Sequence, residues 1–385
     1  MALRVLLPEG SSRQVLPMAK GFKELGCTVT TVQEKSSDLG SVTRYADQKI
    51  VIEGIDSNLE LASKEYQKLI EQEHFDLVIP LSDFSAGIFS ELKEYAETVL
   101  GTKVATNERK VFMDAFDKLN TMKICMKNNL SCPYTLDEVH SIADVPENMP
   151  YPVILKPRSA CGSIGLHLAK NRAELNRFIQ QSKEEGLGDI LIQEFIPQNG
   201  RQYNGHFVLD ADHNVKTAII AEKCRWFPVD GGASTLCRTI HNQHILEICT
   251  KLLKTIGWVG YCDIDLMEDP RDGSVRIIEI NARISANVKL CFAAGANIAK
   301  QLMQLYTGKP VDSCLDYKDD IRLRCVHTDF LWFVKSPHRF HTDPNWFSWK
   351  NTTDQIFSWK DLPVFFTFSL DGLLKYRREM EKRKR

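Results

Sequence analysis

The chain has 385 residues, of which 43% are hydrophobic and 26% are charged. This length predicts two or three domains with buried cores, and the apolar content excludes a mainly disordered chain. The 49 Lys and Arg residues nearly balance the 50 Asp and Glu residues, so no global positive field favours a nucleic-acid partner. No apolar run approaches the roughly 18 residues of a membrane-spanning helix, and the first apolar run is too short for a signal peptide.

The 11 cysteines are scattered, odd in number and never spaced as C-x-x-C. A secreted disulfide framework is denser and even in number, and a zinc site needs clustered Cys and His. Most of these cysteines have apolar neighbours in the sequence, and in such surroundings a thiol behaves as a small hydrophobic group. We therefore expect a reducing, cytoplasmic location.

The first 108 residues alternate strand-like and helix-like patterns, which predicts a Rossmann-like domain with a parallel sheet covered by helices. The loop at 9–13 lacks the G-x-G-x-x-G spacing of a dinucleotide site, so we interpret this domain as a scaffold. A helical stretch at 109–130 follows. After it come predicted strands at 151–156, 164–169, 190–196, 206–209, 215–222, 260–268 and 274–281, with helices at 243–257 and 298–306.

Lys156 ends an apolar strand and is followed by small residues at 159–165. A buried lysine is costly unless an anion meets it, and small residues let backbone amides close around phosphates. A surface lysine before an ordinary hairpin turn explains the same pattern, and the segment alone does not decide between the two. Glu194 lies inside the apolar segment 190–197, where its carboxylate could accept from an adenine amine, but from this segment alone an exposed strand residue is the preferred interpretation.

A third segment carries Asp265, Glu279, Asn281 and Arg283. Glu279 and Asn281 are two residues apart on a predicted strand, so they face one side, and a turn returns Asp265 from the preceding strand to their neighbourhood. Three hard oxygen ligands are typical of a magnesium site. The positive charge of Arg283 could neutralise charge on a phosphoryl group during its transfer. The flanking isoleucines disfavour a solvated edge strand.

Together these segments, over about residues 110–310, resemble the ATP-grasp superfamily, in its branch of carboxylate–amine ligases and carbamoyl-phosphate-synthetase-like enzymes. The resemblance implies an α/β (α+β) fold. It has an N-terminal Rossmann-like domain at 1–108, a two-part ATP-grasp domain at 109–310 with a lid at about 118–195, and an aromatic-rich C-terminal extension with a basic tail at 311–385. It also implies ATP and Mg²⁺, with Mn²⁺ as the alternative metal.

Carried over by position, the resemblance implies three groups of site residues. Arg283 and Lys156 are the catalytic residues, and Asp265, Glu279 and Asn281 are the metal ligands. The nucleotide-binding residues are Lys118, Lys156, Ser159, Gly162, Ser163, Gly165, Glu194, Phe195, Ile196 and Gln202. Two positions depart from the family pattern. Gln202 stands where a ribose-binding glutamate is expected, and Ala282 replaces a proline, but neither change removes a reacting group.

The implied reaction is an ATP-dependent ligation in which a carboxylate takes the γ-phosphate and an amine then displaces phosphate from the acylphosphate. The alternatives are an enzyme that forms carbamoyl phosphate or carboxyphosphate and a non-catalytic ATP-binding regulator. Arg225, Ser234 and Arg238 occupy the region where related ligases contact the acid, and an ordinary ion pair is the competing interpretation for both arginines.

The expected partners are a small acid and a small amine, with a sugar-acid conjugate as one version of the acid and a homodimer as the commonest assembly. The C-terminal segment combines an apolar stretch at 362–374 with basic residues at 375–385. That pattern suits peripheral contact with an anionic membrane at its inner surface, but a solvated helix end is the preferred interpretation.

Overall fold

The computed structural model describes residues 2–137, 139–157, 167–186, 189–229 and 232–382, and it has a mixed α/β architecture with three sheets. The first sheet is parallel, with strand order β3-β2-β1-β4-β5, as the N-terminal pattern predicts. Its strands are β1 (Arg4–Pro8), β2 (Thr28–Gln33), β3 (Gln48–Val51), β4 (Leu77–Val78) and β5 (Lys103–Val104). The helices of this region are α1 (Val15–Glu24), α2 (Leu39–Val42), α3 (Leu59–Gln72) and α4 (Asp83–Tyr95).

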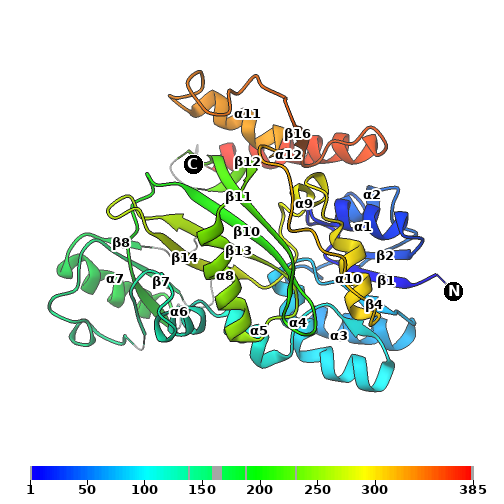
Figure 1. The fold of residues 1–385 in the computed structure, drawn as a ribbon, viewed down its shortest axis with the longest axis horizontal. Helices are drawn as coiled ribbons and strands as arrows, with labels where there is room; N and C mark the ends of the chain where they lie inside the picture. The colour runs from blue at the N-terminus through cyan, green and yellow to red at the C-terminus, as the bar shows by residue number, and fades with distance from the viewer. Residues whose placement is uncertain (1, 138, 158–166, 187–188, 230–231, 383–385) are drawn as a thin grey trace.

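The central sheet has seven strands in the order β14-β13-β10-β11-β12-β15-β16 and is antiparallel except for its last pair. Its strands are β10 (Gln202–Leu209), β11 (Val215–Phe227), β12 (Ala233–Ile240), β13 (Gly260–Glu268), β14 (Val275–Asn281), β15 (Arg322–Arg324) and β16 (Thr352–Asp354). The helix α8 (Gln243–Ile256) packs on one face (Figure 1). The other face meets α1 and α10 (Ile298–Tyr306), so the sheet is buried on both sides over much of its area. The short helix α9 (Lys289–Ala293) lies between β14 and α10 in the chain.

A smaller lobe corresponds to the expected lid and lies beside the central sheet in Figure 1. Its four-stranded sheet has the order β6-β9-β7-β8, and α7 (Arg172–Glu184) packs its apolar face against this sheet. The strands are β6 (Thr135–Leu136), β7 (Val153–Pro157), β8 (His167–Ala169) and β9 (Ile190–Glu194). Residues 159–165, and with them the predicted phosphate-binding residues Ser159, Gly162, Ser163 and Gly165, lie outside the described residues.

The predicted helix at 109–130 is instead two helices, α5 (Arg109–Phe116) and α6 (Lys118–Lys127). Asp117 breaks the helix because its backbone is extended and its side chain accepts hydrogen bonds from the Leu119 and Asn120 N–H groups. This cap places Lys118 at the first position of α6. A second difference is β12, which the sequence analysis did not predict and which carries Ser234 and Arg238.

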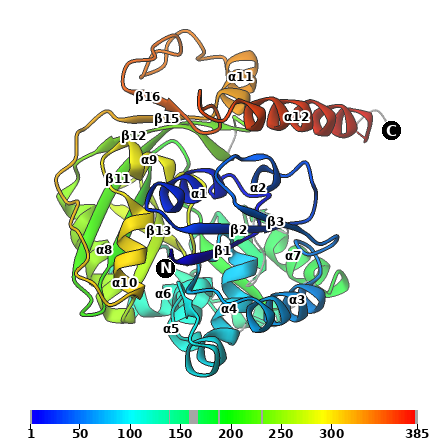
Figure 2. The ribbon, with the colours of Figure 1, turned by 90° about the vertical axis from the view of Figure 1, so that its right-hand side faces the viewer.

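The C-terminal extension forms a layer at one end of the molecule, with α11 (Val326–Lys335) and α12 (Leu362–Lys382) outside the central sheet (Figure 2). Its strands β15 and β16 continue the central sheet beyond β12. The domain boundary expected at residue 310 stays a prediction. Within the described part of the chain, no helix is both long and apolar enough to cross a membrane.

Candidate active site

Four polar side chains share one face of the strand pair β13–β14. Asp265 lies opposite Glu279 and Asp263 lies opposite Asn281, with a bulge just beyond Asp265. Side chains alternate along a strand, so these two cross-strand pairs project from the same face. The structure thus brings the three predicted metal ligands Asp265, Glu279 and Asn281 to one place, together with Asp263.

Three lysines surround these carboxylates. The Lys118 Nζ lies 3.7 Å from the Glu279 Oε2, and the Lys223 Nζ lies 2.7 Å from the Asp265 Oδ1. Burial, followed by the charge of Asp265, raises the pKa of Glu279, while Lys118, Lys156 and Lys223 oppose that rise. The cluster is therefore half-buried, and its positive and negative charges compensate each other. Side chains with perturbed pKa values are common in such surroundings, and they often mark functional sites.

Lys156 reaches the cluster from the lid, on β7. Its Nζ donates to the Gln193 Oε1 at 2.8 Å, and the Gln193 Nε2 donates in turn to the Thr135 Oγ1 at 2.8 Å. Burial lowers the pKa of Lys156 to about 8, with Lys118 adding to the drop and Glu279 opposing it. The hydrogen-bond partner of Lys156 is thus a neutral amide rather than a carboxylate. Its positive charge is therefore available to pair with an anionic ligand.

The lowered pKa of Lys156 predicts that nucleotide affinity depends on pH. As the pH rises through about 8, Lys156 loses its proton and the charge that binds phosphate, so ATP affinity should fall. Measuring the ATP dissociation constant from pH 6.5 to 9.5 tests this. In Lys156→Arg the charge persists to pH above 12, so the decrease should disappear. The exposed Lys183→Arg should behave like the unmodified protein, and an unchanged pH profile in Lys156→Arg would contradict the assignment.

Glu194 lies at the end of β9, where the lid joins the central sheet. One carboxylate oxygen pairs with the guanidinium of Arg271, and the other accepts from the Tyr134 N–H at 3.2 Å. The Phe195 N–H donates to the Pro152 carbonyl at 3.3 Å, and Ile196 is buried. These contacts hold the segment that connects the lid to the central sheet, as expected for a hinge. The role of Glu194 on the adenine side stays a prediction. Gln202 begins β10, between Met267 and Lys223.

Arg283 connects the carboxylate face to the N-terminal domain. Its Nη2 donates to the Asn281 Oδ1 at 2.9 Å, and its Nε lies 3.4 Å from the Oδ2 of Asp83, the first residue of α4. Asp83 follows β4 at the carboxyl edge of the parallel sheet, so this edge meets the cluster. The N-terminal domain therefore provides a wall of the site.

The sequence analysis missed further members of the cluster: Asp263, Asn204, His206 and Lys223. On β10, Asn204 lies opposite Asp265 and His206 lies opposite Asp263. The Asn204 amide donates to both aspartates, at 3.2 Å to the Asp263 Oδ1. Asp263 precedes Asp265 by two residues, so the period of the strand could have identified it. The other three require the strand order, which sequence spacing does not contain.

The donor set fits a magnesium ion. Among the described residues there is no group of three or more His, Cys, Asp or Glu side chains that could hold a metal ion. Two carboxylates and a neighbouring amide match Mg²⁺, because this ion takes one or two protein carboxylates and fills its other positions with water and phosphate oxygens. The buried Oδ1 of Asn204 forms no hydrogen bond to the described residues, so a further oxygen ligand is available beside Asp265.

Arg225 lies away from this cluster. Its Nε and Nη2 donate to the two carboxylate oxygens of Asp329 at 2.8 and 3.0 Å, and its Nη1 donates to the Pro344 carbonyl at 2.8 Å. Its side chain is only 2% exposed and lies over the Trp332 ring. Arg225 therefore carries the ion pair of the competing interpretation, and its guanidinium connects the C-terminal extension to the sheet.

The other two predicted acceptor residues lie on β12. Arg238 pairs with Glu222 at 2.8 Å and with Asp343 at 2.8 Å and keeps a quarter of its side chain exposed. The buried Oγ of Ser234 forms no hydrogen bond within the described part of the chain. Arg238 therefore carries the ion pairs of the competing interpretation, but it is still accessible to a substrate.

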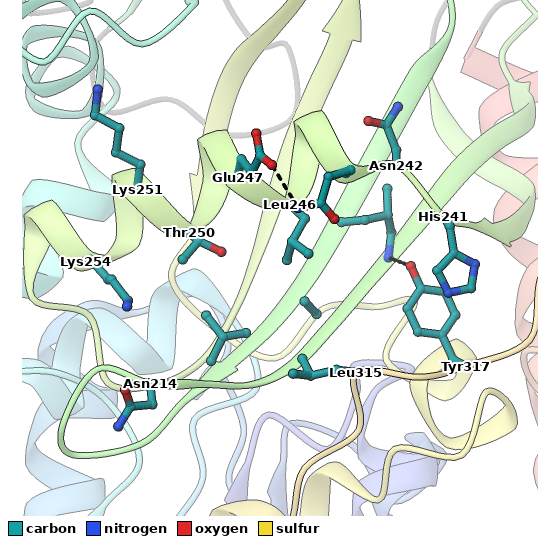
Figure 3. A pocket seen from close by; sticks show the side chains of 14 residues that line it. Asn214, His241, Asn242, Leu246, Glu247, Thr250, Lys251, Lys254, Leu315 and Tyr317 are labelled. Atoms are coloured by element: carbon teal, nitrogen blue, oxygen red, sulfur yellow. Dashed lines mark hydrogen bonds between the residues drawn. The ribbon is translucent and has the colours of Figure 1, made fainter.

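A cavity of about 890 Å³ lies on the opposite face of the central sheet, between β11, α8 and the segment before β15 (Figure 3). Ala218 and Ile220 line it, whereas Lys223 belongs to the other face of β11. At one end, the His241 ring stacks on Tyr317 with centroids 4.4 Å apart. Strand alternation separates this cavity from the carboxylates, so it is not part of the candidate active site.

Comparison with known proteins identifies the domain. Residues 115–287 match the family model described as "ATP-grasp domain". The chain is 25% identical over 322 residues to a D-aspartate ligase of Enterococcus faecium, covering 76% of this chain and 74% of that protein. It is also 25% identical over 313 residues to the N-terminal section of a carbamoyl phosphate synthase large chain of Methanopyrus kandleri. That match covers 76% of this chain and 53% of the relative, so the chain spans about half of its length.

Solved structures agree in fold. A biotin carboxylase of Campylobacter jejuni superposes with a TM-score of 0.70 at 16% identity, over 84% of this chain and 74% of that one. An L-amino acid ligase of Bacillus licheniformis gives a TM-score of 0.61 at 17% identity, over 80% and 75% of the two chains. At these identities the likeness establishes the fold alone. The match at residues 115–287, which contain the charged cluster, identifies this part of the chain as an ATP-grasp domain.

Proposed function

We propose that this protein is an ATP-dependent ligase that joins a carboxylic acid to an amine through an acylphosphate. The observation that carries the proposal is the cluster in which Lys118 and Lys156 face the paired carboxylates of Asp265 and Glu279. The relative named D-aspartate ligase, aligned over three quarters of both chains, supports this class of reaction.

Each part of the cluster has a role in this proposal. Lys118 and Lys156 bind the nucleotide phosphates, and Lys156 also offsets charge on the phosphoryl group. Asp265, Glu279 and Asn281 would hold Mg²⁺, which would supply positive charge next to the nucleotide phosphates. Arg283, fixed by Asn281 and Asp83, stabilises the negative charge of the phosphoryl group as it transfers.

The proposed reaction needs no nucleophile from the protein. A carboxylate oxygen of the acid attacks the γ-phosphorus, the bond to the β-phosphate oxygen breaks, and ADP leaves. The neutral amine then attacks the acyl carbon, the carbon–oxygen bond to phosphate breaks, and the amine nitrogen releases a proton to solvent. Holding the reactants in line and compensating their charge supplies most of the catalysis in such transfers.

A second candidate is the formation of carboxyphosphate or carbamoyl phosphate from bicarbonate. It is favoured by the carbamoyl phosphate synthase relative and by the biotin carboxylase likeness in fold. A non-catalytic ATP-binding regulator has less support. Binding alone does not need Asp265, Glu279, Asn281 and Arg283 together, and the chain keeps all four.

Phosphate release from magnesium-ATP separates these functions. With hydroxylamine as the amine, a ligase should release phosphate only when its acid is present and should yield a hydroxamate of that acid. A matrix of amino acids, uronic acids and their nucleotide conjugates identifies the acid and includes the sugar-acid proposal. Phosphate release stimulated by bicarbonate alone would favour the second candidate. ATP binding without turnover under every condition would favour the regulator.

We also propose a cytoplasmic location and a homodimer. Ten described cysteines are free, and most of them are buried, which suits a reducing compartment. Sedimentation of the purified chain measures the assembly directly, since a dimer has twice the mass of the chain.

A further inference from the structure

The C-terminal extension exposes large apolar side chains to an unusual degree. Among the described residues, exposed aromatic and long aliphatic side chains are scattered singly over the other regions and concentrated here. Trp359 is 81% exposed. The set, which we call the aromatic face, consists of Phe330, Val334, Phe340, Phe347, Trp349, Trp359, Phe366 and Leu370. Concentrated exposed apolar surface marks interaction sites, whereas single exposed residues are ordinary.

Ring contacts support the aromatic face in two groups. Phe333 packs against Phe340 and Phe347, with centroids 5.5 and 5.8 Å apart. At the other end, Phe357 contacts Trp359 at 4.9 Å and Phe365 at 5.4 Å. His327 on α11 belongs to the second group, because its ring lies 5.1 Å from that of Phe365 and 5.0 Å from that of Phe368 on α12. In each group, exposed rings therefore pack on less exposed ones.

Charge is sorted across the extension. Three of its aspartates, Asp329, Asp354 and Asp361, are buried and point into the protein. Its lysines Lys335, Lys350 and Lys360 are exposed. Among the described side chains from 326 to 372, the exposed charged groups are these three lysines and Asp343, which pairs with Arg238. The aromatic face therefore carries more exposed positive than negative charge.

We propose that the aromatic face docks on a lipid surface carrying anionic headgroups. Trp and Phe side chains insert at the boundary between headgroups and acyl chains, and lysines beside them pair with anionic headgroups. A second copy of this chain does not fit, because two positive faces would repel each other. Figures 1 and 2 both show α11 and α12 at one end of the molecule, outside the central sheet.

Vesicle co-sedimentation of the full chain tests the proposal. We expect binding to vesicles of phosphatidylcholine with phosphatidylserine, little binding to phosphatidylcholine alone, and weaker binding as salt increases. The double variant Trp359→Ser/Phe366→Ser should lower the partition coefficient roughly tenfold. Lys350→Glu/Lys360→Glu should also lower it about tenfold. All four positions are exposed, so the fold should not depend on them.

The matched control is Leu59→Ser/Val99→Ser, which removes two side chains of similar exposure, 60% and 65%, from the N-terminal domain. This control should bind anionic vesicles as the unmodified protein does. The proposal is overturned if the unmodified protein does not bind anionic vesicles, or if both extension variants bind them undiminished. Binding to an immobilised acidic polypeptide but not to vesicles would assign the face to an acidic protein partner instead. ATP affinity, measured alongside, shows that each variant keeps its nucleotide site.

Discussion

Glu279→Gln is expected to reduce magnesium-dependent phosphate release at least about 100-fold while the protein stays folded. Glu279 lies opposite Asp265 and beside Lys118, so the substitution removes one of the two carboxylates proposed to hold the metal. The amide keeps the volume and one oxygen of the side chain but loses its negative charge. A neutral oxygen is a much weaker ligand for a hard divalent cation.

The stability of Glu279→Gln should be unchanged or slightly increased. Burial and Asp265 raise the pKa of Glu279, so at neutral pH the folded state holds the carboxylate charge at a cost relative to the unfolded state. Removing that charge removes the cost. A lower activity with an equal or higher melting temperature therefore distinguishes loss of a ligand from loss of fold.

Glu268→Gln is the matched control, since Glu268 ends the same strand, β13, and contacts Tyr203 rather than the cluster. It should leave phosphate release nearly unchanged. Titrating Mg²⁺ for both variants provides a second readout, because Glu279→Gln should need a higher Mg²⁺ concentration. A folded Glu279→Gln protein with the phosphate release of the unmodified chain would show that Glu279 is not a ligand.

The carboxylate face could be predicted from sequence because its geometry is local. Glu279 and Asn281 are two residues apart on one strand, and a short turn joins that strand to the one carrying Asp265. Strand alternation fixes the face on which each side chain lies, and a short turn fixes how the two strands pair. The parallel N-terminal sheet was predictable for the same reason, since each strand is followed by a helix-forming segment.

The remaining partners could not be predicted, because they come from strands whose neighbours are distant in the chain. Lys223 reaches Asp265 only because β10 lies between β11 and β13. Arg225, two residues later, follows a break in the β11–β12 register and instead meets α11, about a hundred residues away in sequence. A basic residue near the acceptor region therefore looks the same in sequence whether it binds substrate or an aspartate of another element.

Asp329→Ala is expected to lower the free energy of unfolding by about 3–5 kcal/mol, the usual cost of leaving a buried charge without its partner. Asp329 is fully buried and pairs with both Arg225, at 2.8 Å, and Arg324, at 2.6 Å. It also accepts from the Thr235 Oγ1 at 2.8 Å. Alanine would leave two guanidinium groups, each 2% exposed, with neither water nor a carboxylate.

Asp343→Ala is the matched control. Asp343 also belongs to the extension and also pairs with an arginine of the central sheet, Arg238, at 2.8 Å, but it is 80% exposed. Water replaces such a partner, so the loss should be at most about 1 kcal/mol. Urea unfolding of the two variants measures the difference. Equal losses would mean that Asp329 does not hold the extension on the sheet. The expected large difference would show that α11, β11 and β15 are joined mainly through one carboxylate, and that the aromatic face is presented on a fixed support.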